Sequence, residues 1–193
     1  MKKQLRQLLP LLLFAIIGLL YSYLPAAQAP KQPPEPVYAA TDTTSTFGNA
    51  RVVRVVDGDT LSVLVDGTDK EVKVRLLGVN TPETVDPRRP VECFGKEASA
   101  YVKARLTHAR VRLEADPEAD EVDKYGRLLR YIYTEDGHNV DADLIRDGYG
   151  FAYTSFPMTD TVKAEFLALE REARDAERGL WSPDACRASA IDK

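Results

Sequence analysis

The sequence predicts an α+β domain, mainly β, in which a five-stranded barrel carries three helices. Three consecutive segments alternate apolar and polar residues with a period of two, which indicates a meander of β-strands. Two later segments are also rich in strand-forming residues, and three others show the spacing and end signals of helices. One helix before the fourth strand and two after the fifth fit a small barrel of the OB type.

The first three strands are expected at 51–56, 61–65 and 72–77. Asp66-Gly67 begins the turn between the second and third strands, because this pair readily adopts tight turns. Successive side chains of a strand point to opposite faces. The alternation in the third strand therefore places Arg75 opposite the apolar residues, where it can leave the core and face a groove.

The later elements are a helix at 95–109, strands at 111–113 and 128–133, and helices at 141–147 and 161–178. Asp141 is the expected N-cap of the short helix and Gly148 its stop. Gly179 is expected to end the last helix, and Trp181 is expected to dock onto the domain.

Residues 1–29 have the features of an export segment. A basic start is followed by an apolar run at 8–24, and Ala27-Gln28-Ala29 offers the small residues that a signal peptidase recognises. The run of 17 residues is long for a signal core and short for a membrane span. A cleaved signal peptide is therefore expected, and an uncleaved N-terminal membrane anchor is the alternative.

The remaining chain divides into a Pro/Thr-rich linker at 30–48, a folded domain at 49–183 and a C-terminal tail at 184–193. The net charge is −4, and the export segment carries three basic residues and no acidic ones, so its removal leaves −7. This charge argues against a protein whose main task is non-specific nucleic-acid binding. It is compatible with an enzyme that holds one phosphate in a local site.

The two cysteines are Cys93 and Cys186. In an exported protein such a pair first indicates a disulfide, and two unpaired thiols are the alternative. The two histidines, His108 and His138, lack the spacing to the cysteines that a zinc site requires.

Three short segments carry the chemistry of the chain: 56–60 (VDGDT), 75–84 (RLLGVNTPET) and 123–127 (DKYGR). Each alone is typical of a turn or loop beside a strand. Together they supply carboxylates for a hard cation, a further carboxylate for the proton of a water molecule, and two arginines for a phosphate. This combination predicts cleavage of a phosphodiester.

With these segments, the stretch 92–100 and the sequence Gly179-Leu180-Trp181, the chain resembles the thermonuclease family, the staphylococcal or micrococcal nucleases, from about Asn49 to Trp181. The resemblance implies a five-stranded OB-fold barrel with three helices. It also implies a calcium-dependent endonuclease that hydrolyses DNA and RNA and leaves 3′-phosphate and 5′-hydroxyl ends.

The resemblance also assigns catalytic roles to residues of this chain. Arg75 corresponds to the arginine that binds the scissile phosphate, and Arg127 to a second arginine that stabilises the transition state. Glu83 corresponds to the carboxylate that orients or deprotonates the attacking water. Lys124 and Tyr125 correspond to partners of a terminal phosphate.

The same resemblance implies a Ca²⁺ site formed by Asp59, Asn80 and the backbone carbonyl of Thr81. The founding member has a second aspartate where this chain has Asn80, so the site has one negative charge fewer and weaker calcium binding is expected. The base-stacking aromatic residue is expected to be Tyr153, with Phe156 as the alternative.

The alternative function is a non-catalytic OB-fold module that binds nucleic acid or protein. An acidic run is expected to be a solvated loop, with a second calcium site as the alternative: Glu114, Asp116, Glu118, Asp120, Glu121 and Asp123. The expected protein is a monomer, secreted, periplasmic or on the cell surface, with DNA and RNA as substrates. It contacts a membrane only if its N-terminal segment is retained.

Overall fold

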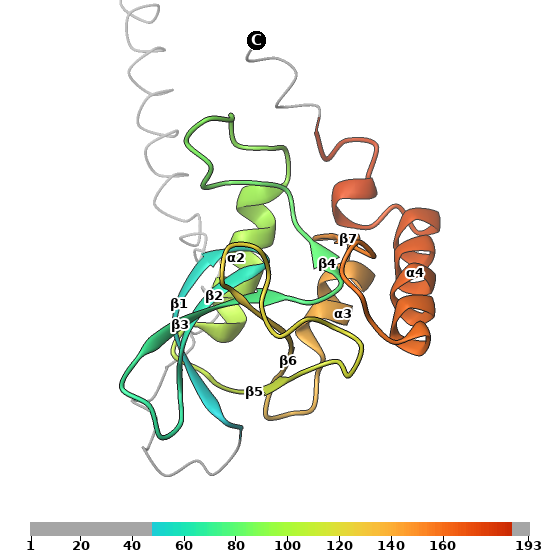
Figure 1. The fold of residues 1–193 in the computed structure, drawn as a ribbon. Coiled ribbons are helices and arrows are strands. Elements are labelled where there is room, and N and C mark those ends of the chain that lie inside the picture. Colours follow the sequence, from blue (N-terminus) through green and yellow to red (C-terminus); the bar gives the residue numbers. More distant parts are fainter. Residues whose placement is uncertain (1–47, 187–193) are drawn as a thin grey trace, which may run out of the picture. The chain divides into compact units, whose positions relative to one another are not determined.

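The structure is a computed structural model that describes residues 48–186 (Figure 1). The predicted export segment, nearly all of the predicted linker and the last residues of the tail lie outside this range. Within residues 48–186, no helix has both the length and the apolar character needed to cross a membrane.

Five strands form a closed barrel in the order β1-β2-β3-β6-β5, as the sequence predicts. They are β1 (Ala50–Asp57), β2 (Thr60–Val65), β3 (Glu71–Leu76), β5 (Arg110–Glu114) and β6 (Leu128–Tyr133). Neighbouring strands run antiparallel except β3 and β6, which are parallel. The parallel pair places the end of β3 beside the loop that enters β6, and this juxtaposition positions the site described below.

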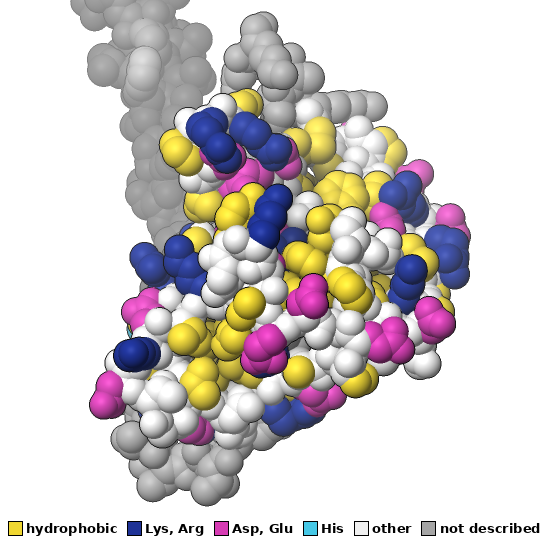
Figure 2. Space-filling view, viewed as in Figure 1, with side chains coloured by type: hydrophobic (Ala, Val, Ile, Leu, Met, Phe, Trp, Pro, Cys, Tyr) yellow, Lys and Arg dark blue, Asp and Glu magenta, His cyan; other side chains and the backbone are white. Residues whose placement is uncertain are grey.

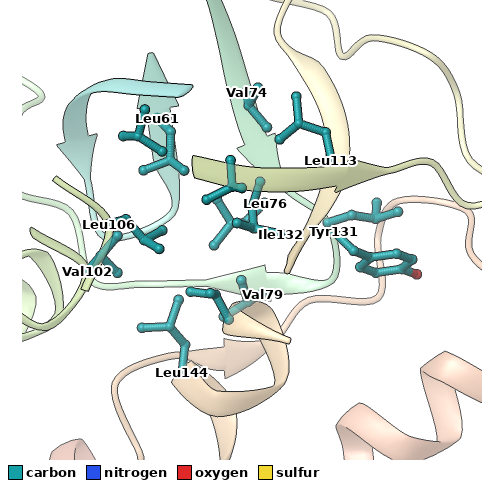
Figure 3. Packing of buried hydrophobic residues seen from close by; sticks show 14 of the residues in the cluster. Leu61, Val74, Leu76, Val79, Val102, Leu106, Leu113, Tyr131, Ile132 and Leu144 are labelled. Atoms are coloured by element: carbon teal, nitrogen blue, oxygen red, sulfur yellow. The ribbon is translucent and has the colours of Figure 1, made fainter. Parts of the chain in front are cut away.

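Apolar side chains from the strands fill the barrel (Figure 3). Leu61 of β2, Leu76 of β3 and Ile132 of β6 are fully buried within it. Val102 and Leu106 of the first helix belong to the same cluster. The alternation seen in the sequence therefore corresponds to one face of each strand packed against a common core.

This part of the chain contains three helices: α2 (Gly95–Leu106), α3 (Val140–Arg146) and α4 (Asp160–Asp175). In Figure 1, α2 lies against the barrel on the side of β1, whereas α3 lies between β6 and α4. A single 3-10 turn, η1 (Gly179–Trp181), follows α4. Its Trp181 ring meets Phe151 at 5.2 Å and lies over Arg174 at 3.9 Å.

The ends of the helices differ from those predicted. Helix α2 ends before 109 because His108 has left-handed backbone with a φ of 61°, which no α-helix contains. Helix α4 ends before 178 for the same reason, since Glu177 has a φ of 51°. Gly179 therefore does not end this helix but begins the 3-10 turn.

The prediction that Asp141 caps α3 was wrong. The N-cap is Asn139, whose side-chain oxygen accepts hydrogen bonds from the backbone N–H groups of Asp141 and Ala142 at 3.0 and 3.2 Å. The side chain of Asp141 instead turns inward and is fully buried. Gly148 follows the end of α3 with a φ of 75°, which suits a helix stop.

The acidic run is not simply a solvated loop. Asp116 is 5% exposed, and its carboxylate accepts hydrogen bonds from the Tyr131 hydroxyl and from both the N–H and the hydroxyl of Thr159. It thereby fastens the β5–β6 connection to the start of α4. Asp123, at the end of the run, accepts hydrogen bonds from Arg127.

Two very short strands, β4 (Val79–Asn80) and β7 (Phe151–Ala152), pair outside the barrel and were not predicted. The chain reaches β4 through Gly78, which has a φ of 83°. A Cβ atom at this position would lie 2.6 Å from the Phe166 ring, so only glycine fits. The glycine therefore allows the sharp turn that leads the chain from β3 into β4.

Cys93 and Cys186 form a disulfide, with their Cα atoms 5.7 Å apart. The predicted pairing is therefore the one that the structure contains. The bond joins the start of α2 to the residues that follow η1.

Candidate active site

A cavity of about 480 Å³ opens between the β1–β2 turn, the segment after β3 and the loop before β6. All the residues that the sequence predicts for catalysis, metal binding and substrate binding line it: Asp59, Arg75, Asn80, Thr81, Glu83, Lys124, Tyr125, Arg127 and Tyr153. The three sequence segments thus meet in one place.

Asp59 lies in the turn between β1 and β2 and is almost buried. One carboxylate oxygen accepts a hydrogen bond from the Thr60 hydroxyl at 2.9 Å, and the other accepts one from the backbone N–H of Thr81 at 3.1 Å. The preceding residue, Gly58, permits this approach, because a Cβ atom there would lie 2.6 Å from the Thr81 hydroxyl. The glycine therefore lets the first two segments come together.

Arg75 lies near the end of β3, with only 4% of its surface exposed. Its Nη1 donates hydrogen bonds to the carbonyl oxygens of Leu76 and Val79 at 2.7 and 2.6 Å. Its Nη2 donates to Asn80 Oδ1 at 3.0 Å and forms an ion pair with Asp59 at 3.2 Å. The prediction that Arg75 faces a groove holds, but the side chain reaches the groove from inside the protein.

Burial lowers the pKa of the Arg75 guanidinium, and the nearby Asp59 carboxylate opposes this shift. An arginine begins from a pKa so high that it stays charged. Its partners fix the guanidinium in one orientation, so that it can act as a preformed positive charge at the floor of the cavity.

Arg127 precedes β6 and is held by a residue four positions earlier. Its Nε donates to Asp123 Oδ2 at 2.7 Å, and its backbone N–H donates to Asp123 Oδ1 at 2.9 Å. Its Nη1 reaches the hydroxyl of Thr60 at 3.1 Å. Burial raises the pKa of Asp123, but the hydrogen bonds from Arg127 outweigh it, so the pKa is lower than usual and the carboxyl stays ionised.

The role of Asp123 was missed by the sequence interpretation. Its spacing of four residues from Arg127 was available as a signal, because a carboxylate and an arginine at that spacing are often close in space. Asp123 and Arg127 do not lie on a helix here, however. A turn closed by the Gly126 N–H, which donates to the Asp123 carbonyl at 2.9 Å, brings them together.

Glu83 follows Pro82 at the mouth of the cavity. One of its carboxylate oxygens accepts hydrogen bonds from the N–H groups of Val85 and Asp86 at 2.7 and 3.1 Å. Burial raises the pKa of Glu83, but these bonds outweigh it and the pKa lies below its usual value. Glu83 is therefore ionised at neutral pH.

Asp57 lies at the end of β1, directly beneath this segment. Its carboxyl accepts hydrogen bonds from the N–H of Gly58 and from the hydroxyl and N–H of Thr84, and it also contacts Glu83. Burial raises the pKa of Asp57. The contacts fasten the Glu83 segment to the barrel.

Aromatic residues form the third wall of the cavity. Tyr153 and Phe156 meet edge to face with their ring centres 5.1 Å apart, and the Arg75 guanidinium lies 5.7 and 5.9 Å from them. Both rings line the cavity, so both alternatives for the stacking residue are in place. At the mouth, the ring of Tyr125 is exposed and lies 5.0 Å from the amine of Lys124.

The oxygen atoms of the residues around Asp59 are of the kind that bind a hard cation. Asp59 offers a carboxylate, Asn80 an amide oxygen and Thr81 a backbone carbonyl, and calcium prefers such oxygen ligands. Within residues 48–186, no cluster of three or more His, Cys, Asp or Glu side chains could hold a metal by itself. A cation here would therefore depend on the amide and carbonyl oxygens as much as on the carboxylate.

The fold and the cavity define a class of protein: an OB-fold hydrolase whose cavity brings two arginines and a carboxylate together. Residues 73–183 match the family described as staphylococcal nuclease homologue. The chain belongs to this family, and it is a nuclease. The relatives described next are named as nucleases, which favours catalysis over the alternative of a non-catalytic binding module.

Three related proteins carry names that describe their activity. The chain is 49% identical to the thermonuclease of Staphylococcus hyicus over 133 residues, which are 68% of this chain and 75% of that protein. It is 41% identical to the thermonuclease of Staphylococcus intermedius over 130 residues, 67% of this chain and 74% of that protein. It is 38% identical to endonuclease YncB of Bacillus subtilis over 135 residues, 69% of this chain and 62% of that protein.

Proposed function

We propose that this nuclease hydrolyses phosphodiester bonds in DNA and RNA in the presence of calcium and leaves 3′-phosphate and 5′-hydroxyl ends. The observation that carries the proposal is the meeting of two fixed arginines and an ionised glutamate in one cavity, which is also lined by Asp59, Asn80 and Thr81. The names of the relatives, two thermonucleases and an endonuclease, support it.

The two arginines would hold the scissile phosphate. Arg75 presents its charge from the floor of the cavity, and Arg127 presents its charge from the wall formed by the loop before β6. Because both guanidinium groups are already oriented by carboxylates and carbonyls, little reorganisation accompanies the reaction. Charge that develops on the phosphate oxygens is thereby stabilised.

Glu83 would orient the attacking water or accept its proton. Its lowered pKa keeps it ionised at neutral pH, and one of its oxygens is already fixed by the loop. A bound calcium ion would supply further positive charge to the phosphate and to the water. Asp59, Asn80 and the Thr81 carbonyl would hold this ion.

The calcium dependence of cleavage and the role of Glu83 can be tested directly. Purified full-length protein is incubated with labelled single-stranded DNA and RNA, with calcium or with a chelator, and the ends are identified by mass spectrometry. Glu83→Gln should lower kcat by about 10²-fold. Glu165→Gln makes the same chemical change on the exposed face of α4 and should leave kcat unaltered. Cleavage that persists in chelator, or full activity of Glu83→Gln, contradicts the proposal.

Replacing Asn80 by Asp should strengthen calcium binding by about tenfold, because it adds a second negative charge to the site. It also removes the Asn80 amide that donates to the Thr81 carbonyl at 3.4 Å, which frees that oxygen for the ion. The acceptor for Arg75 is kept. Calorimetric titration with calcium measures the change in Kd.

The control for this substitution is Lys70→Gln, which lowers the net charge by the same amount at the exposed β2–β3 turn. It should leave the Kd for calcium unchanged. An equal gain in both variants would mean that only the overall charge matters, and no gain in Asn80→Asp would place the calcium elsewhere.

We also propose that the protein acts outside the cytoplasm as a monomer, either released or held by its N-terminal segment. The disulfide supports an oxidising compartment. Basic and acidic side chains are interspersed over the face in Figure 2, which suits a soluble surface domain. Mass spectrometry of the native N-terminus distinguishes cleavage after Ala29 from retention, and light scattering measures the oligomeric state.

A further inference from the structure

We propose that Glu92 is a positioning residue for Glu83, and that the disulfide between Cys93 and Cys186 holds Glu92 in place. The oxidised bridge would then be required for full activity. This inference rests on the proposed role of Glu83 in catalysis, and it adds a residue and a chemical condition that this role does not itself require.

Glu83 and Glu92 stand at the two ends of a loop, and two hydrogen bonds join them. The backbone N–H of Glu92 donates to the carbonyl of Glu83 at 2.8 Å, and the backbone N–H of Glu83 donates to a carboxylate oxygen of Glu92 at 3.0 Å. The two bonds fix both peptide groups that flank the Cα atom of Glu83. They therefore restrict the direction in which the Glu83 side chain leaves the backbone.

The loop between these residues contributes little anchoring of its own. Val85 and Val91 near its two ends are 54% and 49% exposed. The side-chain hydrogen bonds of its arginines stay inside it, from Arg88 to Asp86 and from Arg89 to Glu92. In Figure 1 the loop, drawn in green, extends away from the barrel beside α2. Its geometry therefore depends on its two attachment points, Asp57 with Thr84 at one end and Glu92 with Cys93 at the other.

Cys93 directly follows Glu92, so the disulfide acts on the second attachment point through one peptide bond. Its partner, Cys186, follows a turn that is itself fixed to the fold. The Leu180 N–H donates to the Gly148 carbonyl at 2.8 Å, and the Trp181 ring packs against Phe151 and Arg174. The bridge thus connects the Glu83 loop to the turn that packs on β7 and α4.

Reduction would remove this connection. A dithiol reductant donates two electrons and two protons, the S–S bond becomes two thiols, and the dithiol leaves as its own cyclic disulfide. Glu92 would then be held only by its hydrogen bonds and by the start of α2. Glu83 would sample more orientations, and a displacement of a catalytic group by about 1 Å can lower a rate by about 10²-fold.

The hydrogen bond is tested with Glu92→Ala and Glu92→Gln. Alanine removes the acceptor for the Glu83 N–H, so kcat should fall by about 10- to 100-fold. Glutamine keeps an oxygen at the same place without the charge, so it should restore most of the activity. KM and the calorimetric Kd for calcium should stay within about twofold in both, because neither depends on the direction of Glu83.

Glu71→Ala is the matched control. It also removes a glutamate that pairs with an exposed arginine, Arg54 at 3.8 Å, and it should leave kcat unaltered. If Glu92→Ala keeps full kcat, or if Glu92→Gln is as impaired as Glu92→Ala, the hydrogen bond does not position Glu83.

The bridge is tested by comparing oxidised protein, protein reduced with dithiothreitol, and the variant with both Cys93→Ser and Cys186→Ser. The last two should show a kcat at least about fivefold lower, and dithiothreitol should have no effect on the double variant. Amide hydrogen exchange at Glu83 and Glu92 should become faster in the reduced protein while the barrel strands stay protected. Equal kcat and equal exchange before and after reduction would overturn the proposal.

The two proposals fail in different ways. If oxidised wild-type protein shows no calcium-dependent cleavage, the proposed function is wrong, and the exchange measurement still reports whether the bridge fixes the loop. If oxidised and reduced protein cleave equally well, the function stands and the role given to the bridge is wrong.

Discussion

Replacing Arg127 by Lys should lower kcat for phosphodiester cleavage by about 10³-fold with little change in stability. The side chain makes two kinds of contact that lysine cannot reproduce together. Its Nε donates to Asp123, and its Nη1 points into the cavity toward Thr60. The planar guanidinium can be anchored through one nitrogen and still present others to a phosphate.

A lysine at 127 keeps the positive charge but has a single ammonium group. If that group stays paired with Asp123, it is withdrawn from the phosphate, and if it reaches the phosphate, the buried Asp123 carboxylate loses its partner. Either arrangement weakens stabilisation of the transition state more than binding of the ground state. The loss should therefore appear in kcat and only weakly in KM.

Arg130→Lys is the control for this experiment. Arg130 lies three residues later on β6, is also largely buried and pairs with Glu121, but it does not line the cavity. Its replacement should change kcat by no more than about twofold. Steady-state kinetics of both variants on a short labelled oligonucleotide decide the matter. A fall in Arg127→Lys no larger than in Arg130→Lys would show that a positive charge alone suffices at position 127.

The strands of the barrel could be predicted from sequence because burial of one strand face leaves a period of two. The closure of the barrel could not be read in the same way. It depends on the parallel pairing of β3 with β6, in which Val74 lies beside Leu128. No local pattern reports which distant strands pair, since that choice is made by the packing of the whole core.

The cap of α3 shows a second limit. Asn139 and Asp141 are both good capping residues, and they stand two positions apart. The choice falls on Asn139 because β6 and α3 enclose the side chain at 141, where the Ile132 N–H donates to it at 2.9 Å. The sequence contains the capping signal, but tertiary packing selects the residue.

The residues of the cavity were predicted by resemblance, and the structure brings them together. What the sequence did not contain is how each is held. Arg75 reads as a charge on the outer face of a strand, yet its carbonyl partners and Asp59 allow it to be buried. Glu83 directly follows Pro82 in the sequence, but its orientation also depends on Glu92, nine residues later. Such supporting contacts join separate segments of the chain, so they leave no periodic signal in the sequence.

The second large effect is expected from Asp141, a residue outside the cavity. Its side chain is fully buried behind β6, one oxygen accepts from the Ile132 N–H, and the other has no hydrogen-bond partner within the described residues. Burial raises the pKa of Asp141 from 3.8 to about 8. The folded protein therefore keeps this carboxyl protonated at pH values where the unfolded chain ionises it.

The sign of the effect follows from this difference. Below pH 3.8 both states are protonated, and Asp141 gives stability no pH dependence. Between about pH 4 and pH 8 only the unfolded state ionises, so the free energy of unfolding falls by about 1.4 kcal/mol per pH unit as pH rises. Above pH 8 both states are ionised and the loss is complete.

Asp141→Asn should remove this slope, because the amide has no proton to lose and its oxygen can still accept from Ile132. Between pH 5 and pH 8 the variant should therefore gain about 4 kcal/mol of stability relative to the wild type. Urea unfolding at both pH values, with the disulfide intact, measures the gain. Asp175→Asn, at the exposed end of α4, should instead follow the wild-type pH dependence. If Asp141→Asn also runs parallel to the wild type, the carboxyl at 141 is already ionised in the folded protein at pH 5.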